Sequence, residues 1–83
     1  MFAMWNIGLC YFRLDEHIES ANWYERSAEA GYPRARYNLA IAYANGRGRP
    51  EDRRKAAELA KEAYLAGIAE AGSLLDFLGE KRP

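Results

Sequence analysis

Side chains able to do chemistry are few in this chain. It has one histidine, His17, and one cysteine, Cys10, so it offers neither a zinc-ligand cluster nor an internal disulfide. Ser20 follows His17 by three residues, which makes them neighbours on a helix surface without a third group to orient a general base. The carboxylates fit pairing along helix surfaces. We therefore expect no enzyme, no cofactor and no metal site.

Arginines in the middle of the chain are the best candidates for holding a charged ligand. Guanidinium groups beside the unpaired N–H groups of a helix start can bind a phosphate or a partner's carboxylates. The simpler alternative is a solvated loop, which Glu51 and Asp52 partly neutralise. The candidate anion contacts are Arg47, Arg49, Arg53 and Arg54.

The charge balance narrows the class of partner. The chain has 12 basic and 12 acidic residues, and the basic excess is confined to residues 32–55. A local block of this kind argues against a nucleic-acid-binding face. No apolar stretch approaches the length of a membrane span, and no basic segment precedes the apolar start as in a signal peptide. We expect no membrane partner and a cytoplasmic location, with the periplasm left open.

The sequence contains an internal repeat, and the helices of that repeat would position these side chains. Alanine, an aliphatic residue, a small residue and tyrosine recur with the same spacing 32 residues apart. The two copies are Ala3, Ile7, Gly8, Tyr11 and Ala35, Leu39, Ala40, Tyr43. A third copy begins with Ala71 and Leu75. The sequence predicts one domain, residues 1–83, with repeats at about 3–34 and 35–70 and a partial repeat at 71–83.

Each repeat has the pattern of two helices. The packed residues of the second copy fall on one face of a 3.6-residue period. Gly46 ends the first helix of that repeat, and Pro50 with Glu51 and Asp52 suits the start of the next one. Asp15 is the expected N-cap in the first repeat. The predicted helices are residues 2–13, 16–30, 33–45, 51–66 and 69–78.

The residue sizes also indicate how these helices pack. Alanine and glycine at the repeat positions let neighbouring helix backbones approach closely. Trp23, Tyr11 and Tyr43 are the large residues expected to fill the wider gaps. No alternation with a period of two competes with the helical pattern.

At this point the sequence resembles the Sel1-like repeat family. The motif A-x-x-x-L-G-x-x-Y-x-x-G-x-G is matched by residues 35–48, with Ala40 in place of its glycine. Residues 52–56 continue it as D-x-x-K-A, and Trp23 to Ala28 with Gly31 supply the aromatic closing segment. The first repeat lacks the G-x-G loop. A single cysteine places the chain outside the disulfide-rich branch of the family.

The resemblance implies an all-α fold, a right-handed α-α superhelix of about two and a half helix-turn-helix repeats. The first helix of each repeat would line the concave side of such a solenoid. Apolar residues away from the packed face would then form a stripe that binds a protein or peptide. The alternative is that these residues pack between repeats. The candidate partner-binding residues are Trp5, Leu9, Tyr37, Asn38, Ile41 and Phe77.

The resemblance favours a protein–protein interaction scaffold or adaptor. The alternative function is a homo-oligomeric assembly module or a fragment of a larger Sel1-like repeat protein, because about three repeats are usually needed for stability. Phe2 and Trp5 would lie at an oligomer interface in that case. Cys10 matches a position that is usually apolar in the family, which implies a small buried residue.

Overall fold

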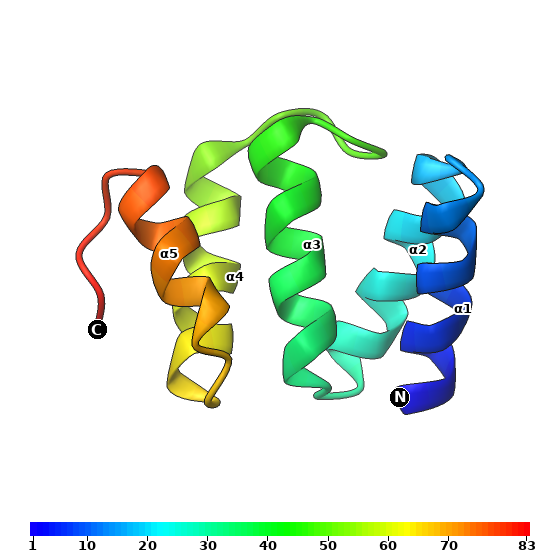
Figure 1. The fold of residues 1–83 in the computed structure, drawn as a ribbon, viewed down its shortest axis with the longest axis horizontal. Coiled ribbons are helices and arrows are strands. Elements are labelled where there is room, and N and C mark those ends of the chain that lie inside the picture. Colours follow the sequence, from blue (N-terminus) through cyan, green and yellow to red (C-terminus); the bar gives the residue numbers. More distant parts are fainter.

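Five helices and no strand make up the computed structural model, which describes residues 1–83. Each helix packs against the next in the sequence, and Figure 1 shows neighbours running in opposite directions from α1 on the right to α5 on the left. The prediction of an all-α fold is confirmed. The helices are α1 (Phe2–Arg13), α2 (His17–Glu29), α3 (Pro33–Asn45), α4 (Arg53–Leu65) and α5 (Glu70–Phe77).

Two helix starts differ from the sequence prediction. The Asp52 carboxylate accepts a hydrogen bond from the backbone N–H of Lys55 at 3.1 Å, so Asp52 is the N-cap and α4 begins only at Arg53. Asp15 was expected to cap α2, but Glu16 holds that position and no side chain caps the helix. Asp15 instead has φ +60, a left-handed conformation that aspartate tolerates, and it turns the chain from α1 into α2.

Alanine dominates the core. Eleven of the fourteen buried apolar residues are alanines, and the other three are Tyr24, Leu39 and Leu75. One close approach lies between α1 and α2, where a Cβ on Gly8 would lie 2.8 Å from the Tyr24 ring. Small side chains at the contacts therefore allow the helix backbones to approach closely, as the sequence indicated.

In the second repeat, other residues form the equivalent contact between the two helices. Ala40 stands where the first repeat has Gly8, and Ala60 stands 36 residues after Tyr24. Both alanines are fully buried and pack in one cluster with Leu75 of α5. The smaller residue on α4 leaves room for a methyl group on α3, and the next repeat fills the remaining space.

The large residues chosen from the sequence lie at the margin of the core. Trp23 is half-buried, and the Arg26 guanidinium lies 4.7 Å from the centre of its ring. Tyr24, the next residue along, points inward instead and is 3% exposed. Tyr43 is half-buried and packs against the cluster around Tyr24 and Leu39. The expectation that Trp23 fills the core is therefore wrong, because the turn of α2 that packs inward is one residue further on.

The outer face of α1 has no helix against it. Ile7 is 37% exposed and Ala3 is exposed, whereas their equivalents Leu39 and Ala35 are 4% and 0% exposed. The difference arises because α2 covers that face of α3, and nothing covers it on α1. Cys10 lies on this same face and is exposed, so the expectation of a buried cysteine is wrong.

The opposite end of the stack is covered by the chain itself. Arg82 of the C-terminal tail forms a two-pronged ion pair with Asp76, with N–O distances of 2.7 and 3.2 Å, and lies over the Tyr64 ring. The Arg82 guanidinium holds the pKa of the Asp76 carboxyl below its ordinary value. Lys61 pairs with Glu80 of the same tail at 3.1 Å. The two ends of the stack thus differ in polarity.

We predict that Gly8→Ala lowers the free energy of unfolding by about 1–3 kcal/mol, the usual cost of overpacking. In an uncrowded helix the same change would be stabilising by about 0.5–1 kcal/mol. Urea denaturation measures the difference. In a Tyr24→Ala background, which reproduces the Ala40 and Ala60 pair, the cost of Gly8→Ala should fall, and only the 3.2 Å approach to the Ser20 carbonyl oxygen remains. A Gly8→Ala variant with a raised urea midpoint would contradict the packing described here.

Candidate functional site

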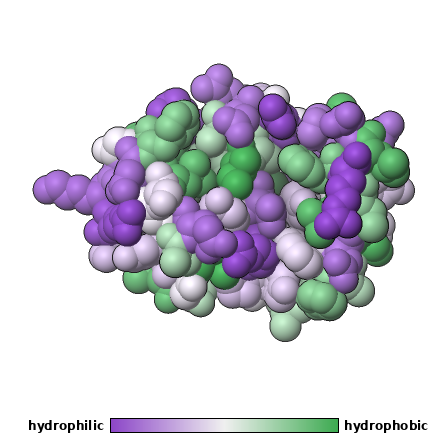
Figure 2. Space-filling view, in the orientation of Figure 1, coloured by the Kyte–Doolittle hydropathy of each residue, from purple (hydrophilic) through white to green (hydrophobic).

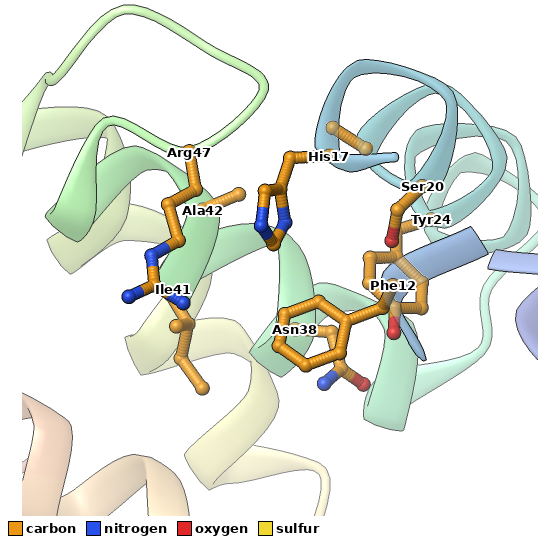
Figure 3. A pocket seen from close by; sticks show the side chains of 9 residues that line it. Phe12, His17, Ser20, Tyr24, Asn38, Ile41, Ala42 and Arg47 are labelled. Carbon is orange, nitrogen blue, oxygen red and sulfur yellow. The ribbon is translucent and has the colours of Figure 1, made fainter. Parts of the chain in front are cut away.

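A cavity of about 90 Å³ lies between the two repeats, where α1, α2 and α3 meet the loop that follows α3. Figure 3 shows His17, Ser20, Tyr24 and Phe12 on one side, Ile41 and Arg47 on the other, and Asn38 between them at the bottom. Its walls are mainly apolar and its polar groups come from three different elements. This cavity combines predicted stripe residues with residues that the sequence did not assign to a site.

Asn38 is held in place by the first repeat. The indole Nε1 of Trp5 donates a hydrogen bond to the Asn38 Oδ1 at 2.8 Å. This bond orients the Asn38 side chain, and its NH₂ group makes no hydrogen bond within the chain. Trp5 also packs against the core cluster around Tyr24 and Leu39. Two residues of the predicted stripe are therefore joined to each other, and Trp5 is structural.

The polar groups on the α2 side of the cavity are mostly engaged. The Ser20 hydroxyl donates to the backbone carbonyl of Gly8 at 2.8 Å in a buried position. Burial raises the pKa of Tyr24. The His17 ring meets the Phe12 ring edge-on with centroids 5.4 Å apart, and its Nε2 lies 3.8 Å from the Asp15 carboxylate. Ser20 and His17 thus share the cavity wall, but the serine proton is directed at a backbone oxygen.

The loop after α3 closes the cavity because it folds back onto the first repeat. Gly48 has φ +76, and a Cβ there would overlap the backbone carbonyl oxygen of His17. Arg49 ties the same loop to α2, donating to the Asn22 side-chain oxygen at 3.0 Å and to the Glu25 carboxylate at 3.3 Å. Figure 1 shows this loop reaching from the top of α3 toward α2. These contacts carry Arg47 to the cavity.

The four candidate arginines do not form one anion site. Arg49 is engaged with α2, and the Arg53 guanidinium lies 5.4 Å from the centre of the Phe77 ring on α5. Arg54 lines a separate surface hollow beside Glu58. Arg47 is the member that lines the cavity. Because the side chains leave the loop and the start of α4 in different directions, the positive block in the sequence is dispersed in space.

The stripe predicted from the sequence is brought together only in part. Asn38 and Ile41 line the cavity, and Leu9 is half-buried on α1. Tyr37 is half-buried with the Arg34 guanidinium 5.8 Å from its ring centre, so it is not freely exposed as expected. Phe77 is 64% exposed but carries Arg53 over its ring.

The sequence named three of the nine lining residues, Asn38, Ile41 and Arg47, but it assigned Arg47 to a separate anion site. Phe12 and His17 are the main lining residues that it did not assign to any site. Phe12 lies three residues after Leu9 on the same helix, so helical spacing was the signal that could have identified it. His17 and Arg47 are brought together by the folded-back loop, for which the spacing gave no signal. The structure groups no three His, Cys, Asp or Glu side chains that could hold a metal ion. None of its helices is long and apolar enough to cross a membrane.

We predict that Gly48→Ala destabilises the fold more than Gly67→Ala does. Both glycines have positive φ, so both variants carry the cost of a left-handed alanine, about 1–2 kcal/mol. No atom lies within 4 Å of a Cβ built on Gly67, whereas one on Gly48 meets His17. Urea unfolding of the two variants gives the comparison. Equal losses would mean that the loop is not packed against α2.

Comparison with known proteins agrees with this architecture. The model of the family described as Sel1 repeat matches residues 2–32 and 33–68. The chain is similar to a protective antigen present in uropathogenic Escherichia coli strains, whose crystal structure displays an SLR fold. The TM-score is 0.84 with 31% identity over 99% of this chain, which spans 19% of the antigen chain. No curated protein matches the sequence. This chain belongs to the Sel1 repeat family.

Proposed function

We propose that the chain is a binding module that holds a protein or peptide on the face formed by α1 and α3, centred on the cavity. Proteins built from Sel1 repeats are in general helical scaffolds for protein interactions. The observation that carries the proposal is the cavity itself, where the apolar side chains of Phe12 and Ile41 meet the polar groups of Asn38 and Arg47. Concave apolar sites with a few convergent polar groups are the usual form of a binding site.

The chemistry of this face favours an interface over a solvated surface. Phe12 is exposed, and Leu9 and Ile41 are half-buried, so several apolar side chains remain accessible to a partner. Aromatic residues and arginine are enriched in protein interfaces. Figure 2 shows apolar and polar groups interleaved on the surface in this view. A mixed surface of this kind suits reversible binding of a peptide.

The hollow between α2, α3 and α4 is a weaker candidate. Its lining includes several charged residues, and two of them, Arg36 and Glu62, pair with each other at 3.6 Å. A partner there would have to compete with that pair for its charged groups. The charges lie near the surface, where ion pairs contribute little affinity.

We predict that Ile41→Glu weakens peptide binding by about tenfold or more, because a charge would enter an apolar contact. The probe is a peptide selected from a random display library on the immobilised chain, and its affinity is measured by fluorescence anisotropy. Ile18→Glu is the matched control, since Ile18 is 67% exposed on α2 and does not line the cavity. Selected peptides that are insensitive to Ile41→Glu would place the binding surface elsewhere.

The outer face of α1 supports a second candidate function, assembly with another copy or another repeat. Ala3, Ile7, Cys10 and Leu14 follow one another at helical spacing, and all four are exposed. On α3 the same face is covered by α2 of the preceding repeat. A further helix could cover it on α1 in the same way. Trp5 is held inside the chain by Asn38, so this face, and not Trp5, would carry the association.

We predict that the chain associates at micromolar concentration and that Ile7→Glu combined with Leu14→Glu shifts it toward the monomer. Light scattering measures the mass. Both residues are exposed in the single chain, so the double variant should keep its helical circular dichroism. A wild-type chain that stays monomeric at every concentration tested would remove the self-association reading and leave the cavity proposal untouched.

A further inference from the structure

We propose that the cavity receives the C-terminal residue of a peptide, with an aliphatic side chain inside and the α-carboxylate on Arg47 and the Asn38 NH₂ group. This inference rests on the proposed function and names the chemistry of its ligand. It follows from three features of the lining: which hydrogen-bonding groups remain free, how much space the apolar walls leave, and how a peptide can present both groups together.

The free side-chain groups of Asn38 and Arg47 in the cavity wall can only donate hydrogen bonds. The Ser20 hydroxyl proton is used by the Gly8 carbonyl, and the Asn38 Oδ1 is used by the Trp5 indole. The Asn38 NH₂ group and the Arg47 guanidinium remain, and neither takes part in a hydrogen bond or an ion pair of the structure. A ligand must therefore bring an acceptor to this site, and an anion would serve a guanidinium best.

No acidic side chain of the chain itself lines the cavity beside Arg47 and Asn38. The cavity lining contains no carboxylate. Asp15 lies 3.8 Å from His17, but its side chain is 93% exposed, so it stands at the outer rim in water. The His17 ring also lies on this wall, on the side that faces Asp15. The net field inside the cavity is therefore favourable to a ligand carboxylate.

The apolar walls leave room for one branched side chain. Phe12, Tyr24 and Ile41 surround a volume of about 90 Å³. An ordered water needs only about 10–15 Å³ of such space, so the cavity is several waters in size. Placing leucine or isoleucine there would release poorly bonded water from apolar walls, which is the usual source of affinity in such sites.

A C-terminal residue presents both groups in the required arrangement. In an extended peptide, successive side chains point to opposite sides, so an acidic neighbour would point away from the cavity when the aliphatic residue enters it. The α-carboxylate, in contrast, is attached to the same Cα as the side chain. A terminal leucine can therefore fill the cavity while its carboxylate reaches the donors of Arg47 and Asn38 in the cavity wall.

The direct test uses single-residue probes in an NMR titration of the ¹⁵N-labelled chain. We expect N-acetyl-leucine to shift the amide signals of the α2 and α3 residues around the cavity, with saturation on the order of 1 mM for a ligand of this size. N-acetyl-leucinamide lacks the charge, and N-acetyl-alanine lacks the side chain. Each should bind about tenfold more weakly.

Two arginine variants separate the proposed contact from general charge. Arg47→Gln should remove the preference for N-acetyl-leucine over its amide. Arg54→Gln carries the same charge change on a residue that lines a different surface hollow, and it should keep the preference. The Arg47 side chain makes no hydrogen bond or ion pair within the chain, and its backbone N–H bond to the Ala42 carbonyl is kept in the variant. The spectrum away from the cavity should therefore stay unchanged and report an intact structure.

The outcomes distinguish this inference from the proposed function. Equal binding of acid and amide, an unchanged preference in Arg47→Gln, or no shift at about ten times the expected saturation value would overturn the carboxylate assignment. Peptides selected by display could still depend on Ile41 in that case, and the α1 and α3 face would remain the binding surface. Loss of the Ile41 dependence would instead remove the proposed function, and the inference with it.

Discussion

The close approach of helix backbones is the constraint on which the rest of this structure depends. Alanine and glycine occupy the contact faces, so the core is thin and large side chains are held at its margins. In the first repeat Gly8 leaves space for the Tyr24 ring, and in the second Ala40 and Ala60 pack in one cluster with Leu75. Because few large side chains fill the space between repeats, a cavity remains beside Tyr24 where α1, α2 and α3 meet.

Contacts between the two repeats close this cavity and orient the side chains in its wall. Gly48 lets the loop after α3 lie directly on the backbone of α2, and Arg49 fastens it to Asn22 and Glu25. The Trp5 indole crosses in the other direction to orient Asn38, which is 33 residues away in the sequence. Neither repeat alone contains the cavity. The cavity and the binding proposed for it therefore depend on the stacked pair, and the cavity geometry depends on the same packing that gives the chain its stability.

Much of the fold could be predicted from the sequence because helical periodicity and glycine stops are local signals. Five helices follow from them, the spaced motif indicated the family, and helical register placed Asn38 and Ile41 together, where they line the cavity. Periodicity does not say what covers a face, which is why Cys10 was expected to be buried and Tyr37 to be free. Periodicity also locates the inward-facing position only to within one residue, so Trp23 was expected in the core where the structure has Tyr24. His17 and Arg47 meet through the path of a loop, and no spacing rule describes that path.

Our central proposal is that a ligand binds between the two repeats on the α1 and α3 face. The most direct measurement is a crystal structure of the chain with a display-selected peptide bound. In that crystal structure we expect an apolar peptide side chain between Phe12 and Ile41, with an acceptor oxygen within hydrogen-bond distance of Arg47 or Asn38. A peptide seated in the hollow between α2, α3 and α4, with the cavity left free, would contradict it.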